Sequence, residues 1–213
     1  MSTLDRLTPG TWTFDPAHSE VGFVVRHAGI SKVRGSFHDV TADFVVAEQV
    51  EDSSIDAVIK TASIDTGDES RDAHLRTADF FDVENKPEIT FHSTSIQLGG
   101  GEGTITGELT INGVTRTVEL DTEFNGVVVD AFETTRAGFE ATTTISRKDF
   151  GLTWNAAIEA GGVLVSDKVV LNLDVAFTAP QARDPPRRLS APLPADAGCA
   201  ARKDEAPVTG SLR

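Results

Sequence analysis

The feature that most constrains the fold of this chain is a succession of segments in which apolar and polar residues alternate. Residues 168–177, KVVLNLDVAF, are the clearest case, with apolar side chains at every second position. A period of two is typical of a strand with one buried face. The pattern predicts about eight strands, drawn from residues 10–14, 18–27, 33–46, 55–64, 89–98, 104–111, 114–124, 136–145 and 168–177.

Many short strands and few helices predict an all-β fold, either an antiparallel sandwich or a barrel. The dipeptide Asn112-Gly113 is the strongest hairpin signal in the chain. Within residues 33–46 the apolar residues of one face shift from odd-numbered positions (Phe37) to even-numbered ones (Ala42, Phe44 and Val46). This shift predicts a bulge near Asp39 and Val40 that would curl the sheet toward closure. A closed antiparallel barrel of eight strands would have an interior just wide enough for side chains or one small ligand.

One stretch, residues 65–91, carries a helical signal. Asp65, Thr66 and Asp68 offer N-cap oxygens, and Asn85-Lys86-Pro87 ends the segment before a new strand. We expect one short helix at about residues 68–79. Two interpretations are open: the helix plugs or covers a cavity in the barrel, or it only closes the end of a solid core.

The net charge excludes some partners. Residues 180–213 hold six Lys/Arg and four Asp/Glu, so the net charge of −14 leaves −16 for residues 1–179. Nucleic-acid binding needs a basic face, so no nucleic-acid partner is expected. The acidic body also argues against docking on anionic lipid by charge. The single cysteine, Cys199, allows neither a disulfide framework nor a cysteine-based metal site.

The composition divides the chain into three parts. Residues 1–9 are expected to form a loose N-terminal arm, and residues 10–179 the barrel domain. Residues 180–213 are rich in proline and alanine and are expected to be a disordered tail. The N-terminal sequence contains no apolar leader segment, and no run reaches the roughly 18 apolar residues of a membrane span. We therefore expect a cytoplasmic protein without an integral membrane segment.

The sequence contains no known catalytic motif, and its histidines do not form a pattern typical of metal binding, so neither a metal nor a required cofactor is expected. His38 and His92 are expected to face solvent. His27 is the one imidazole expected to point inward, either as a hydrogen-bonded core residue or as a polar contact for a ligand. An enzyme acting on a small amphiphile would need His27 within reach of Arg34 or Asp39.

The predicted interior is rich in aromatic residues, since the chain has 12 Phe, two Trp and no Tyr. A barrel lined by Phe and Val suits a hydrophobic ligand. A packed core without any ligand is the alternative, which would make this a structural or interaction protein.

Several sequence blocks resemble the YceI-like family. The first comprises DPAHS at 15–19, the alternating residues 21–27 and VRGSF at 33–37. The second comprises SRDAHL at 70–75, DFFDV at 79–83 and PEITF at 87–91, and the third comprises GELTI at 107–111, GVTRTV at 113–118 and SRKDFGL at 146–152. Together the blocks cover about residues 10–178 in the family's order.

The resemblance implies a lipocalin-like barrel that binds, and carries or sequesters, a polyisoprenoid lipid such as an isoprenoid quinone, with a stress response as one setting. Some members of the family are periplasmic. Arg34 and Arg71 are then candidate head-group contacts, although Arg71 and Asp72 could instead form an ion pair that braces the helix. Edge strands make a homodimer plausible. The expected ligand-binding residues are Val21, Phe23, Val25, His27, Phe37, Phe44, Phe80, Phe81, Phe91, Leu109, Phe139, Phe150 and Trp154.

Overall fold

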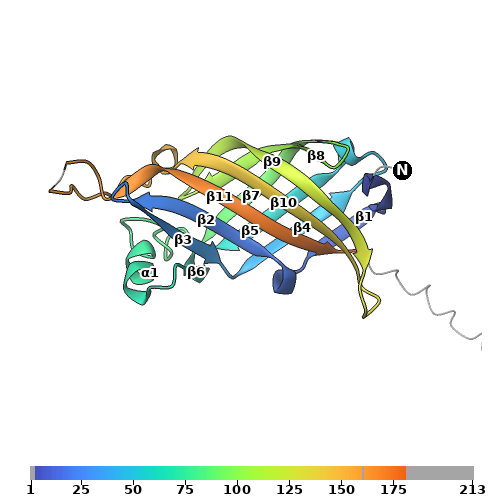
Figure 1. Ribbon diagram of the computed structural model, residues 1–213, viewed down its shortest axis with the longest axis horizontal. Helices are drawn as coiled ribbons and strands as arrows, with labels where there is room; N and C mark the ends of the chain where they lie inside the picture. The colour runs from blue at the N-terminus through green and yellow to red at the C-terminus, as the bar shows by residue number, and fades with distance from the viewer. Residues whose placement is uncertain (1–2, 160, 181–213) are drawn as a thin grey trace, which may run out of the picture. The chain divides into compact units, whose positions relative to one another are not determined.

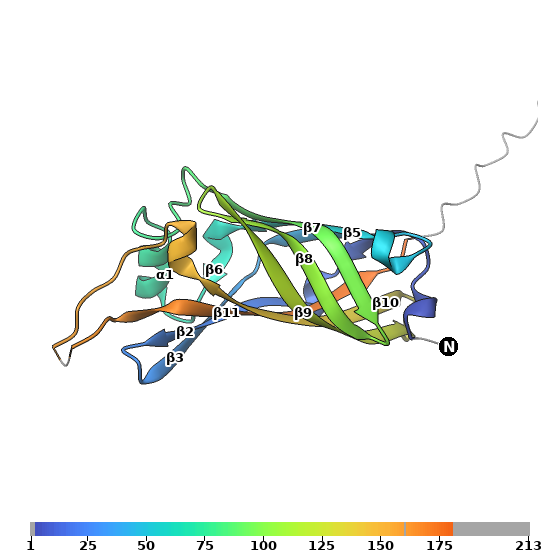
Figure 2. The same ribbon diagram turned by 90° about the horizontal axis from the view of Figure 1, so that it is seen from above.

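The computed structural model describes residues 3–159 and 161–180, and the predicted tail at 180–213 lies almost entirely outside them. The described part is built almost wholly of strands (Figures 1 and 2). These are β1 (Gly10–Phe14), β2 (Glu20–His27), β3 (Ser31–Phe37), β4 (Val40–Val46), β5 (Ser54–Lys60), β6 (Ile64–Asp65), β7 (Glu88–Gly99), β8 (Glu102–Ile111), β9 (Val114–Val129), β10 (Thr135–Ser146) and β11 (Val165–Thr178). The helices are α1 (Glu69–Leu75) and five 3₁₀ turns, η1 (Thr3–Arg6), η2 (Pro16–His18), η3 (Val50–Asp52), η4 (Thr61–Ser63) and η5 (Arg147–Phe150).

The strands form a closed antiparallel barrel with eight strand positions around its wall, each of which we call a line. This confirms the fold prediction. From β7 to β11 each line is one long strand paired with the next. The first three lines are each broken in two: β1 continues as β2, β3 as β4, and β5 as β6. Pairing of β11 with both β1 and β2 closes the barrel, with Phe14 opposite Phe177 and Val21 opposite Leu173.

The break between β3 and β4 replaces the bulge expected near Asp39 and Val40. His38 and Asp39 leave the regular ladder, but the His38 amide donates to Ser63 O at 3.3 Å and the Lys60 amide donates to Asp39 O at 2.9 Å. The neighbouring line breaks at the same level, between β5 and β6. These two residues explain the shift of the apolar positions. Phe37, before the break, and Val40 and Ala42, after it, all face the interior.

The hairpin at Asn112-Gly113 joins β8 and β9 as predicted. Both residues have positive φ, 55° and 77°, as a type I′ turn requires. The turn sets the register in which Ile111 pairs with Val114, and the pairing continues without interruption to Glu102 and Glu123. The alternating inward residues of both strands therefore face the same interior.

The helix is shorter than the expected residues 68–79. Asp68 is the N-cap, and its carboxylate accepts from the Arg71 amide at 3.0 Å. The helix ends at Leu75, and irregular turns follow to residue 87. Ala73 and Ala78 are exposed, so the segment reaches the interior through Leu75 and the turn at Phe80-Phe81 rather than through a helical stripe.

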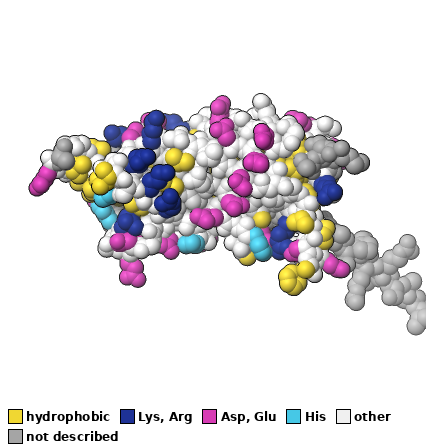
Figure 3. All heavy atoms as spheres, viewed as in Figure 1, with side chains coloured by type: hydrophobic (Ala, Val, Ile, Leu, Met, Phe, Trp, Pro, Cys, Tyr) yellow, Lys and Arg dark blue, Asp and Glu magenta, His cyan; other side chains and the backbone are white. Residues whose placement is uncertain are grey.

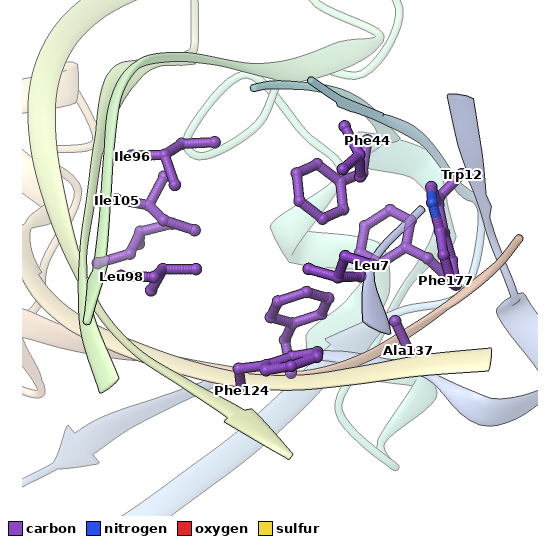
Figure 4. Close-up of a cluster of buried hydrophobic side chains, with 12 residues drawn as sticks. Leu7, Trp12, Phe44, Ile96, Leu98, Ile105, Phe124, Ala137 and Phe177 are labelled. Carbon is purple, nitrogen blue, oxygen red and sulfur yellow. The ribbon is translucent and has the colours of Figure 1, made fainter. Parts of the chain in front are cut away.

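The two ends of the barrel differ. At the end where η1 lies, a buried cluster packs between the strands, and Figure 4 shows its side chains pointing toward one another inside the ring of strands. Leu7 is only 8% exposed and packs in this cluster, so the described part of residues 1–9 is not a loose arm. Trp12 is fully buried and donates through Nε1 to Thr8 O at 2.9 Å. We call this the N-terminal end, and the opposite end, which holds α1 and η5, the helix end.

A polar seam fixes β1 to β10 at the N-terminal end. Asp15, just after β1, accepts from Arg136 Nε at 2.7 Å and from the Ala17 amide at 3.1 Å, and lies 3.0 Å from His18 Nδ1. Arg136 also pairs with Asp130. The Arg136 guanidinium, helped by the contacts to His18 and Ala17, holds the pKa of Asp15 below its usual value. The carboxylate is therefore ionised wherever the protein is folded near neutral pH.

Candidate functional site: an apolar barrel cavity

The barrel encloses a cavity of about 240 Å³, somewhat below the roughly 300–1,000 Å³ typical of small-molecule pockets. All its lining residues are apolar or glycine except Thr122 and Arg147. Every strand line contributes, and the segment after α1 adds further residues. The cavity extends beside the inward face of β11 from Val169 to Phe177, which is about 26 Å of strand at 3.3 Å per residue. A small volume extending over such a length suits a narrow, linear ligand.

The lining follows from the period of two in the strands. On β11 the residues at alternate positions from Val169 to Phe177 face the cavity, whereas Asn172 and Asp174 face outward. The outward residues Lys168, Asn172 and Asp174 are polar, whereas Val170, which also faces outward, is a partly exposed apolar residue. The same alternation that predicts the strand therefore also builds the apolar wall.

Nine of the expected ligand-binding residues line this cavity, although their contact with a ligand stays a prediction. They come from β2, β3, β7, β8, β10 and the segment after α1. They are Val21, Phe23, Val25, Phe37, Phe80, Phe81, Phe91, Leu109 and Phe139.

Four other expected residues do not line the cavity. Phe44 is 2% exposed and packs edge-on to Phe139 and Phe177 within the N-terminal-end cluster. Phe150 is equally buried, at the end of η5 behind the wall. Trp154 stands beyond the lining and contacts Phe80, with ring centroids 5.2 Å apart.

His27 is the fourth of these residues. It is the last residue of β2, two positions after Val25, and it is paired with Ser31 where the hairpin between β2 and β3 begins. Its side chain is half-buried. The possible enzyme needed this imidazole beside Arg34 or Asp39, but both of those residues are exposed. The grouping that this alternative would need is therefore not assembled in the cavity.

Neither arginine proposed as a head-group contact lines the cavity. Arg34 lies on the outer face of β3. Arg71 donates through Nε to Thr66 Oγ1 at 2.7 Å and through a terminal nitrogen to Thr66 O at 2.9 Å. Asp72, 6% exposed, accepts from the Thr66 amide at 3.0 Å. Arg71 and Asp72 thus both brace α1 against the turn that precedes it, through Thr66 rather than through each other.

Arg76 adds a second brace to the same segment. It donates to Ala62 O at 3.0 Å and to Ile64 O at 2.7 Å, the backbone oxygens of η4 and β6. These contacts hold the segment after α1 at the barrel wall. Phe81 then meets Phe37 edge-on at 5.8 Å, and Phe37 lies 5.9 Å from Phe23. The resulting row of three rings forms part of the cavity wall.

Arg147 is the one charged lining residue, and the sequence analysis did not select it. It is 4% exposed, and its guanidinium donates to the backbone oxygens of Ser166, Leu152 and Val165. Burial lowers the pKa of Arg147, and Asp167 partly opposes that change. The three carbonyls satisfy part of the guanidinium, and they tie η5 to the start of β11. The only signal in the sequence was its place in the SRKDFGL block.

The polar residues of the described chain outside the cavity do not form a metal site. His38 and His92 are exposed, as expected, and lie near Asp65 and Asp56. Within residues 3–159 and 161–180 no group of three or more His, Cys, Asp or Glu converges. Cys199 lies outside the described residues. No helix in the described part is long and apolar enough to span a membrane.

Comparison with known proteins places the chain in a family. The model of the YceI-like domain matches residues 12–177. A UPF0312 protein of Staphylococcus aureus strain N315 is 36% identical over 171 residues, which are 78% of this chain and 96% of that protein. The solved YceI protein of Campylobacter jejuni is 32% identical, with a TM-score of 0.63 over 73% of this chain and 90% of its own.

A structure described as a polyisoprenoid binding domain, from Saccharophagus degradans, shares the fold. Its TM-score is 0.60 over 79% of this chain and 98% of its own, at 16% identity. Likeness at that identity concerns the fold alone. The family model and the Staphylococcus relative both cover most of the described barrel, and this chain belongs to the YceI-like family.

Proposed function

We propose that the barrel binds the hydrocarbon chain of a polyisoprenoid lipid, such as a polyprenyl compound or an isoprenoid quinone, and carries or sequesters it. The observation that carries the proposal is the long, narrow cavity whose lining is apolar except for Thr122 and Arg147. The polyisoprenoid binding domain of Saccharophagus degradans, which shares the fold, supports the ligand class.

The affinity would come from the chain rather than from the head group. Burying one CH₂ contributes about 0.8 kcal/mol, or roughly a fourfold change in Kd. Such a ligand needs few polar contacts. The wall offers a single charged side chain, Arg147, already bonded to three carbonyls, which supports binding rather than catalysis. A cytoplasmic location, a role in stress response and a homodimer stay predictions of the sequence.

The first test is the chain-length dependence of affinity. Titration with isoprenoid quinones of increasing chain length should show Kd falling with each added unit and then levelling off when the cavity is full. The same affinity for the shortest and longest quinones would contradict burial of the chain.

A matched pair of variants on β10 tests where the chain lies. Ala141 lines the cavity, whereas its neighbour Thr142 is exposed on the outer face. Ala141→Phe should block the cavity and weaken quinone binding at least tenfold, while Thr142→Phe should leave it unchanged. Circular dichroism checks that both variants fold, and Ala57→Phe on β5 provides a second block if Ala141→Phe does not. Equal affinities in the folded variants would exclude the cavity as the binding site.

A further inference from the structure

The charge of this acidic protein is unevenly distributed along the barrel. On β2 and β3, Arg26 is paired with Lys32, and Val24 with Arg34. Val24 is also paired with Val170 of β11, so Lys168 occupies the next outward position on that strand. These adjacent outward positions make up what we call the basic patch: Arg26, Lys32, Arg34 and Lys168, all exposed.

The cations of the basic patch are not neutralised by neighbouring acids. Among the ion pairs of the described chain, none involves any of the four. Asp167, adjacent to Lys168, is half-buried and accepts from Ser146 Oγ at 2.9 Å and from the Lys148 amide. The electrostatic free energy of four like charges placed together is lowered when an anionic surface approaches them.

The acidic residue Asp65 lies close to the patch, since it is paired with Ser36, two residues from Arg34, and its carboxylate lies 3.4 Å from His38. Other acidic residues on this face lie further along the barrel. Glu20 and Asp174 are paired with each other and belong to a mainly acidic outer depression. Figure 3 shows a group of dark-blue side chains toward the helix end and magenta ones over the middle of this face, with further magenta side chains at the lower edge of the helix end. Glu20 is four residues from Val24, about 13 Å of strand, whereas the screening length at physiological salt is about 8 Å. The patch therefore acts locally despite the net charge of −14.

Protection of a sheet edge explains only part of the patch. Residues 31–35 of β3 pair with β2 alone, so Lys32 and Arg34 lie on a partly open edge where charges prevent aggregation. Arg26 and Lys168 are on strands paired on both sides, where no such protection is needed. Edge protection therefore does not account for Arg26 and Lys168.

An exposed apolar tip lies beside the patch. Ile30, between β2 and β3, is 88% exposed. The Ala28 amide of this hairpin donates to Leu164 O at 2.7 Å, which brings the half-exposed Val163 to the same end. The cavity lining also extends to this end, through Leu75 and Val165. Apolar side chains flanked by cations fit the boundary between lipid head groups and acyl chains.

We propose that the helix end docks on an anionic lipid bilayer, with the basic patch against the head groups and Ile30 inserted below them. A bilayer accounts for the apolar tip, which a nucleic acid would not use. Docking goes beyond the proposed ligand, because it needs only the outer surface. The acidic composition predicts no such docking, and the proposal rests instead on the local arrangement of charge.

The test is sedimentation of the full chain with vesicles that contain no isoprenoid lipid. Binding should occur with mixed phosphatidylglycerol and phosphatidylcholine vesicles, weaken as salt is raised, and be absent with phosphatidylcholine alone. Arg34→Gln should weaken binding about fivefold, in line with the typical contribution of one cation near a membrane surface. Arg6→Gln, which removes an exposed cation from the opposite end, should leave binding within twofold of the wild type.

The two hairpin tips provide a matched apolar pair. Phe132 is also 88% exposed, but it stands between Asp130 and Glu133 at the tip between β9 and β10. Ile30→Ser should weaken binding to anionic vesicles, and Phe132→Ser should not. Equal binding to both vesicle types, equal effects of Arg34→Gln and Arg6→Gln, or preferential binding to a nucleic acid or an acidic protein would overturn the proposal. The Ala141→Phe variant should still bind anionic vesicles, which distinguishes a failure of docking from a failure of cavity binding.

Discussion

Phe80 and Phe81 are neighbours in the chain but have different surroundings. Phe80 is 8% exposed and packs against both His74 and Trp154, with centroid distances of 5.2 Å to each. Phe81 is half-buried and ends the row of rings through Phe37. Phe80→Ala should lower the free energy of unfolding by about 3–5 kcal/mol. Phe81→Ala should cost less stability and mainly weaken quinone binding, as thermal melting and titration would show. Equal stability losses with unchanged affinity would mean that both rings are ordinary core.

Arg147 is predicted to hold the helix end together rather than to bind the ligand. Its three bonds to backbone oxygens join η5, the following loop and β11. Arg147→Gln should therefore lower the free energy of unfolding by at least about 2 kcal/mol, since bonds to a charged donor contribute about 1.5–3 kcal/mol each. Hydrogen exchange should increase first in residues 152–159 and 161–164. Lys148→Gln, which changes an exposed neighbour, is the control and should alter neither measurement.

Asp15 predicts a pH dependence at the seam between β1 and β10. Its pKa in the folded protein lies below the ordinary value of 3.8, so the carboxylate stabilises the fold above that pH, and this contribution is lost as the pH falls through the folded pKa. Asp15→Asn should be less stable than wild type near neutral pH, and the difference should shrink as the pH falls below 3.8. A difference that stays constant down to the lowest pH would show that the carboxylate charge contributes nothing.

Inside the strands most cavity-facing residues could be predicted from the sequence, whereas at the strand ends and beyond them they could not. The period of two placed Val21, Phe23 and Val25 on the wall, but His27 falls where the line stops. Phe150 and Trp154 lie outside strands, so alternation could not assign them a face. Arg147 was not found for the same reason, since it begins η5. Hydrophobicity alone could not separate Phe44 of the solid core from the lining, because both environments are apolar.

At the scale of elements, Gly35 shows how neighbouring strands accommodate large rings. Gly35 is paired with Phe23, whose ring lies over it, and a Cβ at this position would meet Phe23 Cζ at 2.5 Å. Gly35→Ala should push the ring aside, lower stability by about 1–3 kcal/mol and reduce quinone affinity. Gly138→Ala is the control, because its Cβ would have one ordinary neighbour at 3.6 Å. Equal melting temperatures for the two variants would contradict the close packing.

Most elements could be predicted from the sequence, and the errors have a common cause. The hairpin signal at Asn112-Gly113 and the alternation in β8, β9 and β11 are local, so they survive folding. The breaks that divide β3 from β4 and β5 from β6 depend on bonds between lines, such as Lys60 to Asp39. The length of α1 depends on tertiary bracing, since Arg71, Asp72 and Arg76 bind groups outside the helix. A single sequence does not show either kind of contact.

At the scale of the whole barrel, each end holds a buried apolar cluster, and the basic patch lies at the helix end. The N-terminal end is packed by Leu7, Trp12 and their neighbours (Figure 4). The helix end combines the segment after α1, Arg147 and the basic patch. Docking at the helix end would bring the part of the cavity lining formed by Leu75 and Val165 nearest to the bilayer.

The central claim is that a polyisoprenoid chain lies along the inside of the barrel, and photolabelling tests it most directly. An isoprenoid quinone with a photoreactive group in its tail would be bound, irradiated and mapped by mass spectrometry of peptides. The account predicts labels on the inward residues of β11, Leu171, Leu173 and Val175, and none on Asn172 and Asp174 between them. Labels confined to outward residues, or no label at saturating quinone, would contradict the account.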